Sequence, residues 1–179
     1  MRGAVITLGI VALAVALWQS FAPESLPVKQ IDLEEEQLIA SYLLEGTRRH
    51  FSEDGAASDV LEIGEATQWQ NSEETTLSEI RYRAQGENGA VWDVVAAAGV
   101  FFEDINELEL KNGVTVLERT RDATVQTESM RLYMDQKRAQ GEQEVVMTSR
   151  SSRTTGSAFE LDLQSSVATL KGDVKTEYE

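Results

Sequence analysis

Apolar and polar residues alternate with a period of two from Tyr42 onward, and this alternation limits the possible folds more than any other feature of the chain. Side chains of a β-strand point alternately to opposite faces, so the pattern predicts antiparallel strands with one apolar and one polar face. Within each segment the apolar residues share one parity: Ile80, Tyr82 and Ala84; Trp92, Val94, Ala96 and Ala98; Leu108, Leu110, Val114 and Val116; Met130, Leu132 and Met134; Phe159, Leu161 and Leu163; Ala168, Leu170, Val174 and Tyr178. The sequence therefore predicts a mainly β domain.

Glycines mark where these strands turn or bend. Asp54-Gly55 and Asn88-Gly89 are typical of hairpin turns. Asn112-Gly113 has two interpretations, a hairpin or a bend within one strand. The bend is favoured because the apolar parity on either side of Gly113 is unbroken, and Gly172 has the same setting. A glycine inside a strand pattern indicates a bulge or a sharp bend, which is how a sheet curls.

The bends recur along the chain. Gly113, Gly141 and Gly172 follow one another at spacings of 28 and 31 residues, and 127–135 parallels 155–163. Each unit supplies about two strands and a bend, and stacked units bury a continuous apolar interior between curved sheets. The predicted fold is an N-terminal transmembrane helix followed by a curled, taco-like antiparallel β-jelly-roll, with open edges at its first and last strands.

The segment from Gly3 to Trp18 is apolar and uncharged. It is either a membrane anchor or a cleaved signal peptide. The anchor is favoured, because the run is longer than a typical signal core and Trp18 suits the interface. The small residues Gly3, Gly9 and Ala12 would let another membrane helix pack closely. The expected division is an anchor over 1–22, a linker over 23–40, with a short helix over 32–40 as its alternative, and a β-domain over 41–179.

Composition excludes several classes of function. The net charge of −15 disfavours nucleic acid, and an anionic ligand would have to be held by apolar contact or by a local basic patch. Cysteine is absent, and any zinc site would rely on His50 and carboxylates. The sequence has no Walker loop, no Gly-x-Ser-x-Gly and no His-Glu-x-x-His motif. We therefore expect no enzymatic activity, no metal and no cofactor.

An ordered set of short motifs carries a family resemblance. After the apolar N-terminal segment come 42–46, 51–55, 92–96, 108–116, 127–130, 155–157 and 170–178. In this order they resemble the LptC family of lipopolysaccharide-export proteins. The resemblance implies a single-pass inner-membrane protein with most of its chain in the periplasm. It also implies a carrier that receives lipopolysaccharide from the LptB/LptF/LptG transporter, bound through the transmembrane helix and the N-terminal edge, and passes it to LptA.

The candidate site residues follow from the strand parity and the resemblance together. The residues expected to face the acyl chains of lipid A are Ile80, Tyr82, Trp92, Val94, Leu108, Leu110, Val114, Val116, Met130, Leu132, Met134, Phe159 and Leu161. The residues expected to form the edge that binds LptA are Leu170, Lys171, Gly172, Val174, Lys175, Thr176 and Tyr178. The alternatives are a tethered β-sandwich that joins envelope proteins through its edge strands without binding lipid, and a secreted enzyme.

Overall fold

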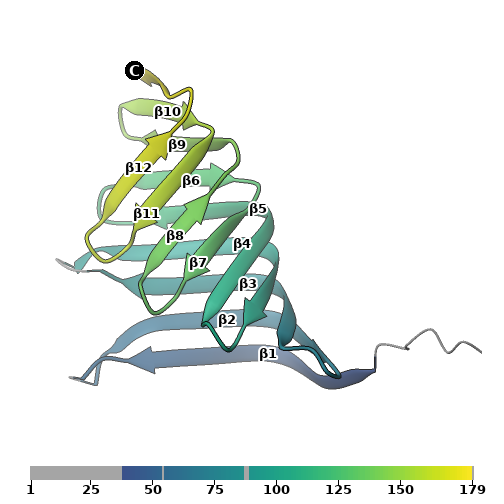
Figure 1. Ribbon diagram of the computed structural model, residues 1–179. Helices are drawn as coiled ribbons and strands as arrows, with labels where there is room; N and C mark the ends of the chain where they lie inside the picture. The colour runs from purple at the N-terminus through teal and green to yellow at the C-terminus, as the bar shows by residue number, and fades with distance from the viewer. Residues whose placement is uncertain (1–37, 54, 87–88, 179) are drawn as a thin grey trace, which may run out of the picture. The chain divides into compact units, whose positions relative to one another are not determined.

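The computed structural model describes residues 38–53, 55–86 and 89–178, and these residues form a single antiparallel sheet of 13 strands (Figure 1). The strands are β1 (Ile39–Phe51), β2 (Ala57–Trp69), β3 (Glu74–Gln85), β4 (Val91–Phe102), β5 (Glu107–Glu118), β6 (Ala123–Thr127), β7 (Met130–Tyr133), β8 (Arg138–Gly141), β9 (Val145–Ser149), β10 (Ser152–Gly156), β11 (Ala158–Asp162), β12 (Val167–Lys171) and β13 (Lys175–Tyr178). The mainly β prediction is confirmed. Ile39 and Ala40 belong to β1 rather than to a helix.

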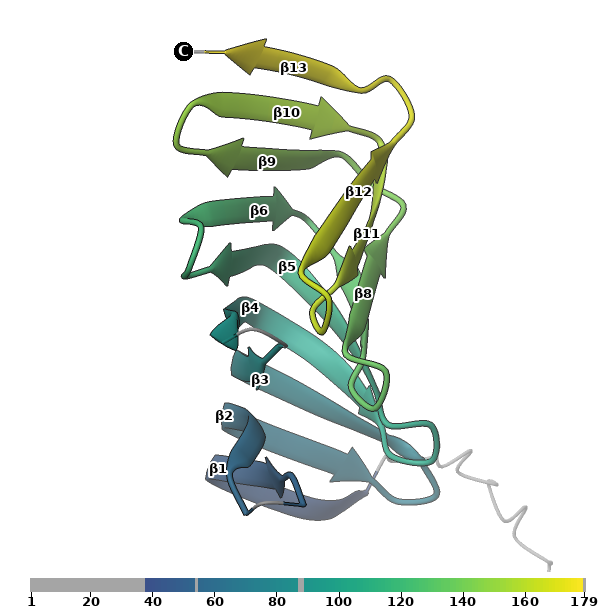
Figure 2. The same ribbon diagram turned by 90° about the vertical axis from the view of Figure 1, so that its left-hand side faces the viewer.

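The sheet folds into two layers, and β5 is where they divide (Figure 2). Residues 107–110 of β5 pair with β7, whereas residues 114–118 pair with β6. The first layer continues from β7 through β8 and β11 to β12, and the second continues from β6 through β9 and β10 to β13. The long strands β1 to β4 bend and give one half to each layer. An apolar interior lies between the layers, as a curled β-jelly-roll requires.

A line of bends runs along the edge where the two layers join. In β5 it falls at Asn112 and Gly113, whose φ angles are 64° and 85°, so the favoured interpretation of a bent, continuous strand is correct. In β1 and β3 it falls at Glu45 and Glu79, with φ angles of 52° and 51°. The left-handed region suits glycine and asparagine, which explains the signal at β5. The glutamates carry no such signal.

Two expectations about parity need correction. In β4 the pairing shifts between Ala96 and Ala98, so Gly99 rather than Ala98 returns to the buried face. At Gly172 the chain does not continue as one bent strand. Gly172 and Asp173 both have left-handed φ, 67° and 47°, which ends β12 and carries the chain across to β13 in the other layer.

The core forms where the inner faces of the two layers meet. Its buried members come from β2 to β11, and Ile63, Phe101, Met147, Ala168 and Leu170 pack against it while staying partly accessible. In contrast, Val174 and Tyr178 are exposed, so they are not core residues despite their parity. Among the described residues, no helix is both long and apolar enough to cross a membrane, and the expected anchor over 3–18 lies outside them.

Candidate functional site

The residues expected to face lipid all lie in the interior between the layers. Each of them, from Ile80 to Leu161, has a residue exposure of 5% or less. Neighbouring strands place them in rows, such as Tyr82, Val94 and Val116 in the second layer, and Leu108 with Leu132 in the first. Because these side chains fill the interior themselves, an acyl chain can reach them only if the two layers separate. Their contact with lipid stays a prediction.

The layers also meet on the side opposite the bends, along a line that we call the seam. The seam is formed by the turns and strand ends at 85–86, 89–90 and 119–122 of the second layer, and by those at 103–106, 134–137 and 163–166 of the first. The backbones of the two layers approach each other closely at Gly86. A Cβ placed there would lie 2.3 Å from the carbonyl oxygen of Leu163, so this position has no room for a side chain.

Cationic side chains cross the seam at successive points. The Arg48 guanidinium donates to Asn106 Oδ1 at 3.1 Å and lies 5.4 Å from the centre of the Phe101 ring. Lys137 Nζ donates to the Gln85 carbonyl oxygen at 2.9 Å. Arg121 Nη1 donates to the Ser166 carbonyl oxygen at 2.9 Å. All three acceptors are neutral oxygens. We call Arg48, Lys137 and Arg121 the seam cations.

Two carboxylates, one buried and one partly exposed, fix the turns that carry these contacts. Glu118 is 1% exposed, and its carboxylate accepts the backbone N–H groups of Thr120 and Arg121 at 3.0 and 2.7 Å. Asp162 likewise accepts the backbone N–H groups of Gln164 and Ser165, and the bond from Ser165 lowers the pKa of Asp162 below its ordinary value. The turns that carry Arg121 and its acceptor are therefore held in place.

Polar atoms without partners lie next to the seam. Among the described residues, Tyr82 Oη, Trp92 Nε1 and Ser166 Oγ are buried and make no hydrogen bond. Burial, with the charge of Asp59 adding to it, raises the pKa of the Tyr82 hydroxyl, which keeps it protonated at neutral pH. Buried donors without a partner are costly in a folded protein. The seam thus has hydrogen-bonding capacity that the chain itself leaves unused.

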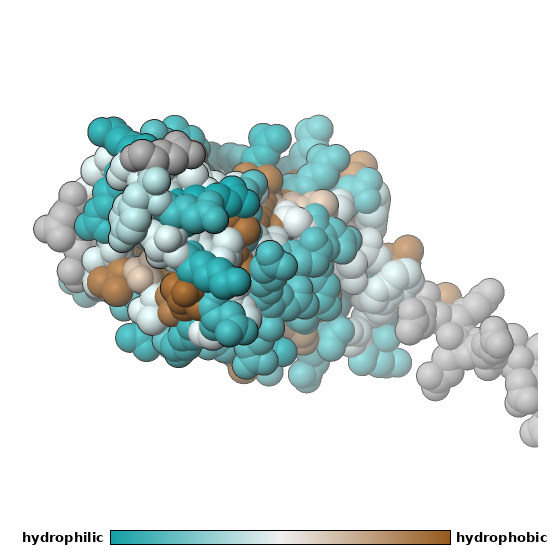
Figure 3. Space-filling view, turned by 90° about the horizontal axis from the view of Figure 1, so that it is seen from above, coloured by the Kyte–Doolittle hydropathy of each residue, from teal (hydrophilic) through white to brown (hydrophobic). Residues whose placement is uncertain are grey.

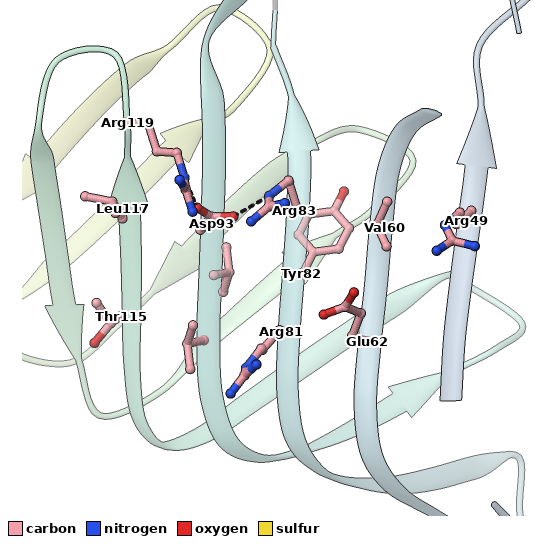
Figure 4. Close-up of a pocket in the computed structure, with 12 residues that line it drawn as sticks. Arg49, Val60, Glu62, Arg81, Tyr82, Arg83, Asp93, Thr115, Leu117 and Arg119 are labelled. Atoms are coloured by element: carbon pink, nitrogen blue, oxygen red, sulfur yellow. Dashed lines mark hydrogen bonds and ion pairs between the residues drawn. The ribbon is translucent and has the colours of Figure 1, made fainter. Parts of the chain in front are cut away.

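A separate hollow of about 590 Å³ lies on the outer face of the second layer (Figure 4). Its lining combines four arginines with apolar side chains such as Val60 and Leu117. The arginines are Arg49, Arg81, Arg83 and Arg119. Arg81 and Arg83 alternate with the inward-facing Ile80 and Tyr82, so period two explains their outward direction. The cluster has no signal in the sequence, because its arginines come from β1, from β3 and from the position after β5.

Within this hollow, Asp93 lies between two guanidinium groups. Arg83 Nε donates to Asp93 Oδ1 at 2.7 Å, and Arg119 Nε donates to Oδ2. Partial burial of Asp93 opposes its ionisation, but the hydrogen bonds from Arg83 and Arg119 outweigh that effect and lower its pKa below the ordinary value of 3.8. The ionised form is therefore favoured by folding.

We expect the replacement Asp93→Asn to lower the melting temperature at neutral pH, with the difference from the wild type shrinking under acid. A carboxyl group whose pKa is lowered by folding stabilises the protein above its unfolded pKa, and this contribution disappears as the pH falls through the folded pKa. The difference should be constant above pH about 5 and decline below about 4. Thermal unfolding followed by circular dichroism from pH 2.5 to 7 tests this, and a difference that does not change with pH would contradict it.

The open edges of the sheet lie at its two ends. β1 pairs with β2, and within the described residues its other edge has no strand; its side chains Tyr42, Leu43 and Leu44 are more than half exposed. The predicted docking segment is divided, since Leu170 and Lys171 lie in β12, Gly172 and Val174 lie in the connection, and Lys175, Thr176 and Tyr178 lie in β13. Seen from above, hydrophilic side chains dominate and apolar ones form separate patches (Figure 3).

Within the described residues, the single histidine is not part of a catalytic hydrogen-bond relay. The His50 side chain is 60% exposed, with Nδ1 3.9 Å from Asp59 Oδ2, and the Ser58 hydroxyl donates to Asp59 Oδ2 and to the His50 carbonyl oxygen rather than to the imidazole. Within the described ranges, no group of His, Asp and Glu is arranged to hold a metal ion. The arrangement offers instead an apolar interior with a seam along one side.

Comparison with known proteins identifies one family. The family model described as LptC, lipopolysaccharide-assembly, LptC-related, matches residues 4–179. Among solved structures, the chain is similar to LptH of Pseudomonas aeruginosa, described as the LptA homologous periplasmic component of the conserved lipopolysaccharide transport device. That similarity has 11% sequence identity and a TM-score of 0.33, and it covers 80% of this chain and 96% of LptH. No curated protein matches the chain.

Proposed function

The chain belongs to the LptC-related family of lipopolysaccharide-assembly proteins, and on that premise we propose that its β-domain carries lipopolysaccharide with the acyl chains between its two layers. In this proposal the domain stands in the periplasm and is tethered to the inner membrane by the segment 3–18. It receives lipid from the LptB/LptF/LptG transporter, bound through that segment and the β1 edge, and passes it to LptA. The chain performs no chemistry.

The observation that carries this proposal is the continuous apolar interior. Its rows extend through successive strands, from Leu61 in β2 to Phe159 and Leu161 in β11, and partly accessible residues such as Ile63 and Leu170 lie toward its two ends. Each methylene transferred from water to such a setting contributes about 0.8 kcal/mol. Several acyl chains therefore supply enough free energy to part the layers and replace the contacts that they lose.

The second candidate function is a scaffold that joins envelope proteins through its edges without binding lipid. The open edge of β1 favours it, because an edge strand is a template for strand addition by another chain. Edges of this kind are also needed by a carrier that must connect to proteins on both sides. The two functions are therefore distinguished by lipid in the interior, not by the edges.

We expect a photoreactive side chain placed inside the domain to react with lipopolysaccharide during ATP-driven extraction. Suitable positions are Trp92, Phe101 and Met147, since the aromatic residues match the probe in shape and Phe101 and Met147 are only partly buried. The fully buried Leu110 and Leu132 are further positions, provided that the substituted domain still folds. Adducts are measured by immunoblot after irradiation with the complete transporter present.

The matched control is Val95, which neighbours Val94 in β4 but points outward and is 47% exposed. Glu109, Arg131 and Lys175 provide further outward positions. The probe at these sites should give only background adducts. Equal labelling of Val95 and Trp92 would reject the interior path, and labelling of neither in an active transporter would favour the scaffold.

A further inference from the structure

We propose that the seam cations Arg48, Lys137 and Arg121 form a track for the phosphate groups of the lipid, outside the interior that holds its acyl chains. This inference deepens the proposed function and rests on it, since it assigns the part of the ligand that the apolar interior cannot bind. A strongly acidic chain needs a local basic site for an anion, and the seam supplies one beside the opening through which acyl chains must pass.

The first support is that the seam cations donate their hydrogen bonds to neutral oxygen atoms. Lys137 and Arg121 donate to backbone carbonyls, and Arg48 donates to a neutral amide. Hydrogen bonds to an ionised acceptor are roughly twice as strong as those to a neutral one. A phosphate oxygen that reaches the seam can therefore displace each neutral acceptor, and each displacement removes one contact that holds the layers together.

The second support is the spacing of the cations. Arg48 belongs to β1, Lys137 contacts the end of β3, and Arg121 follows β5. Neighbouring strands lie about 4.8 Å apart, so contacts on every second strand follow one another at roughly 10 Å. A headgroup that leaves one cation has the next within reach of a short shift. The order runs from the N-terminal end of the sheet toward its C-terminal end.

The third support is the set of buried polar atoms beside the track. Tyr82 Oη, Trp92 Nε1 and Ser166 Oγ have no partner among the described residues, and Tyr82 and Trp92 lie on the inner face of the second layer. Tyr82 and Trp92 can donate to sugar or phosphate oxygens that approach through an opened seam. The partners that these donors lack in the closed domain are of the kind that a phosphorylated glycolipid carries.

Carboxylates also face the seam, and they set how strongly an anion is held. Asp135 accepts a hydrogen bond from Asn106, Asp59 accepts one from Ser58, and Glu118 and Asp162 accept backbone N–H groups. Within the described residues none of these carboxylates forms an ion pair with a seam cation, but their charges oppose a bound phosphate. The track should therefore bind phosphate weakly at each step, which suits passage rather than storage.

Two probes separate the track from the interior. The first is the dephosphorylated lipid, which keeps its sugar and acyl chains but has no phosphate. The second is the deacylated phosphorylated disaccharide, which keeps its sugar and phosphates but has no acyl chain. Binding of both to the full chain in detergent is measured for the wild type and for the double variant Lys137→Gln/Arg121→Gln. We expect the double variant to bind the phosphorylated disaccharide at least about tenfold more weakly and the dephosphorylated lipid as well as the wild type does.

The charge control is Lys111→Gln, which removes a cation that pairs with Glu109 on the outer face, away from the seam. It should leave binding of both probes unchanged, and Lys137→Arg/Arg121→Lys should retain binding of the disaccharide. Unchanged disaccharide binding by the glutamine variant, or an equal loss in Lys111→Gln, overturns the track. Failure of the wild type to bind dephosphorylated lipid instead rejects the acyl interior, whatever the disaccharide shows.

Discussion

A covalent link across the seam should stop the domain from taking up lipid. The link joins Arg121→Cys to Ser166→Cys through a short, reducible bifunctional thiol reagent. The native chain has no cysteine, so these are its only thiols, and Arg121 already contacts the backbone of Ser166 at 2.9 Å. The buried interior admits an acyl chain only when the layers part. We expect linked protein to retain at least tenfold less dephosphorylated lipid than unlinked protein, with recovery after reduction.

Dephosphorylated lipid is the appropriate cargo because the substitution removes Arg121, a proposed phosphate contact. The matched control links Glu109→Cys to Arg131→Cys, which face each other on β5 and β7 within a single layer. That link fastens two strands that need not move apart, so loading should persist. Undiminished loading of the seam-linked protein would show that lipid reaches the interior from the ends of the sheet rather than through the seam.

Removal of residues 173–179 should abolish capture of LptA by the domain. The deletion removes β13, which pairs with β10 and leaves its outer edge open among the described strands. Strand addition at such an edge would continue the second layer into the partner. A deletion from 168 onward is less informative, because Ala168 and Leu170 in β12 pack against the core and their loss would also destabilise the domain. Capture is measured by pull-down with LptA, and a melting temperature close to that of the intact protein verifies the fold.

Point substitutions separate backbone from charge at the same edge. Lys175→Pro removes a backbone donor from β13, whereas Lys175→Glu reverses a charge and keeps that donor. We expect the proline variant to lose more affinity for LptA than the glutamate variant. Normal capture by the protein that lacks 173–179 would place the docking edge elsewhere, with the edge of β12 that does not face β11 as the alternative in the first layer.

The strands and their inner faces could be predicted because the signal for both is local. Alternation places Leu108, Leu110, Val114 and Val116 on one face, and all four are buried. Asn112 and Gly113 suit left-handed backbone, so the bend in β5 was also predictable. Glu79 adopts the same conformation without the residue type that favours it. At Glu79 the bend depends on pairing with the neighbouring strands, and the residue type at this position does not indicate it.

The seam could not be predicted from the sequence. Lys137 and Gln85 are 52 positions apart, and their contact joins a side chain to a backbone carbonyl that any residue would supply. Gly86 resembles an ordinary loop glycine in the sequence, and its need for space arises only where Leu163 passes. The arginine hollow has the same cause, since Arg81 and Arg119 meet only after the sheet has formed.

The line of bends gives the successive long strands from β1 to β5 the same two-layer outline, which the shorter strands continue. Each added pair of strands repeats the same outline. The geometry of the fold therefore sets no limit on the number of strands in the sheet. At either end the exposed surface is a slice through that profile, bounded by unpaired backbone. A partner with the same profile needs to match its geometry more than its side chains. Joined domains would then make a single conduit whose length depends on how many are stacked.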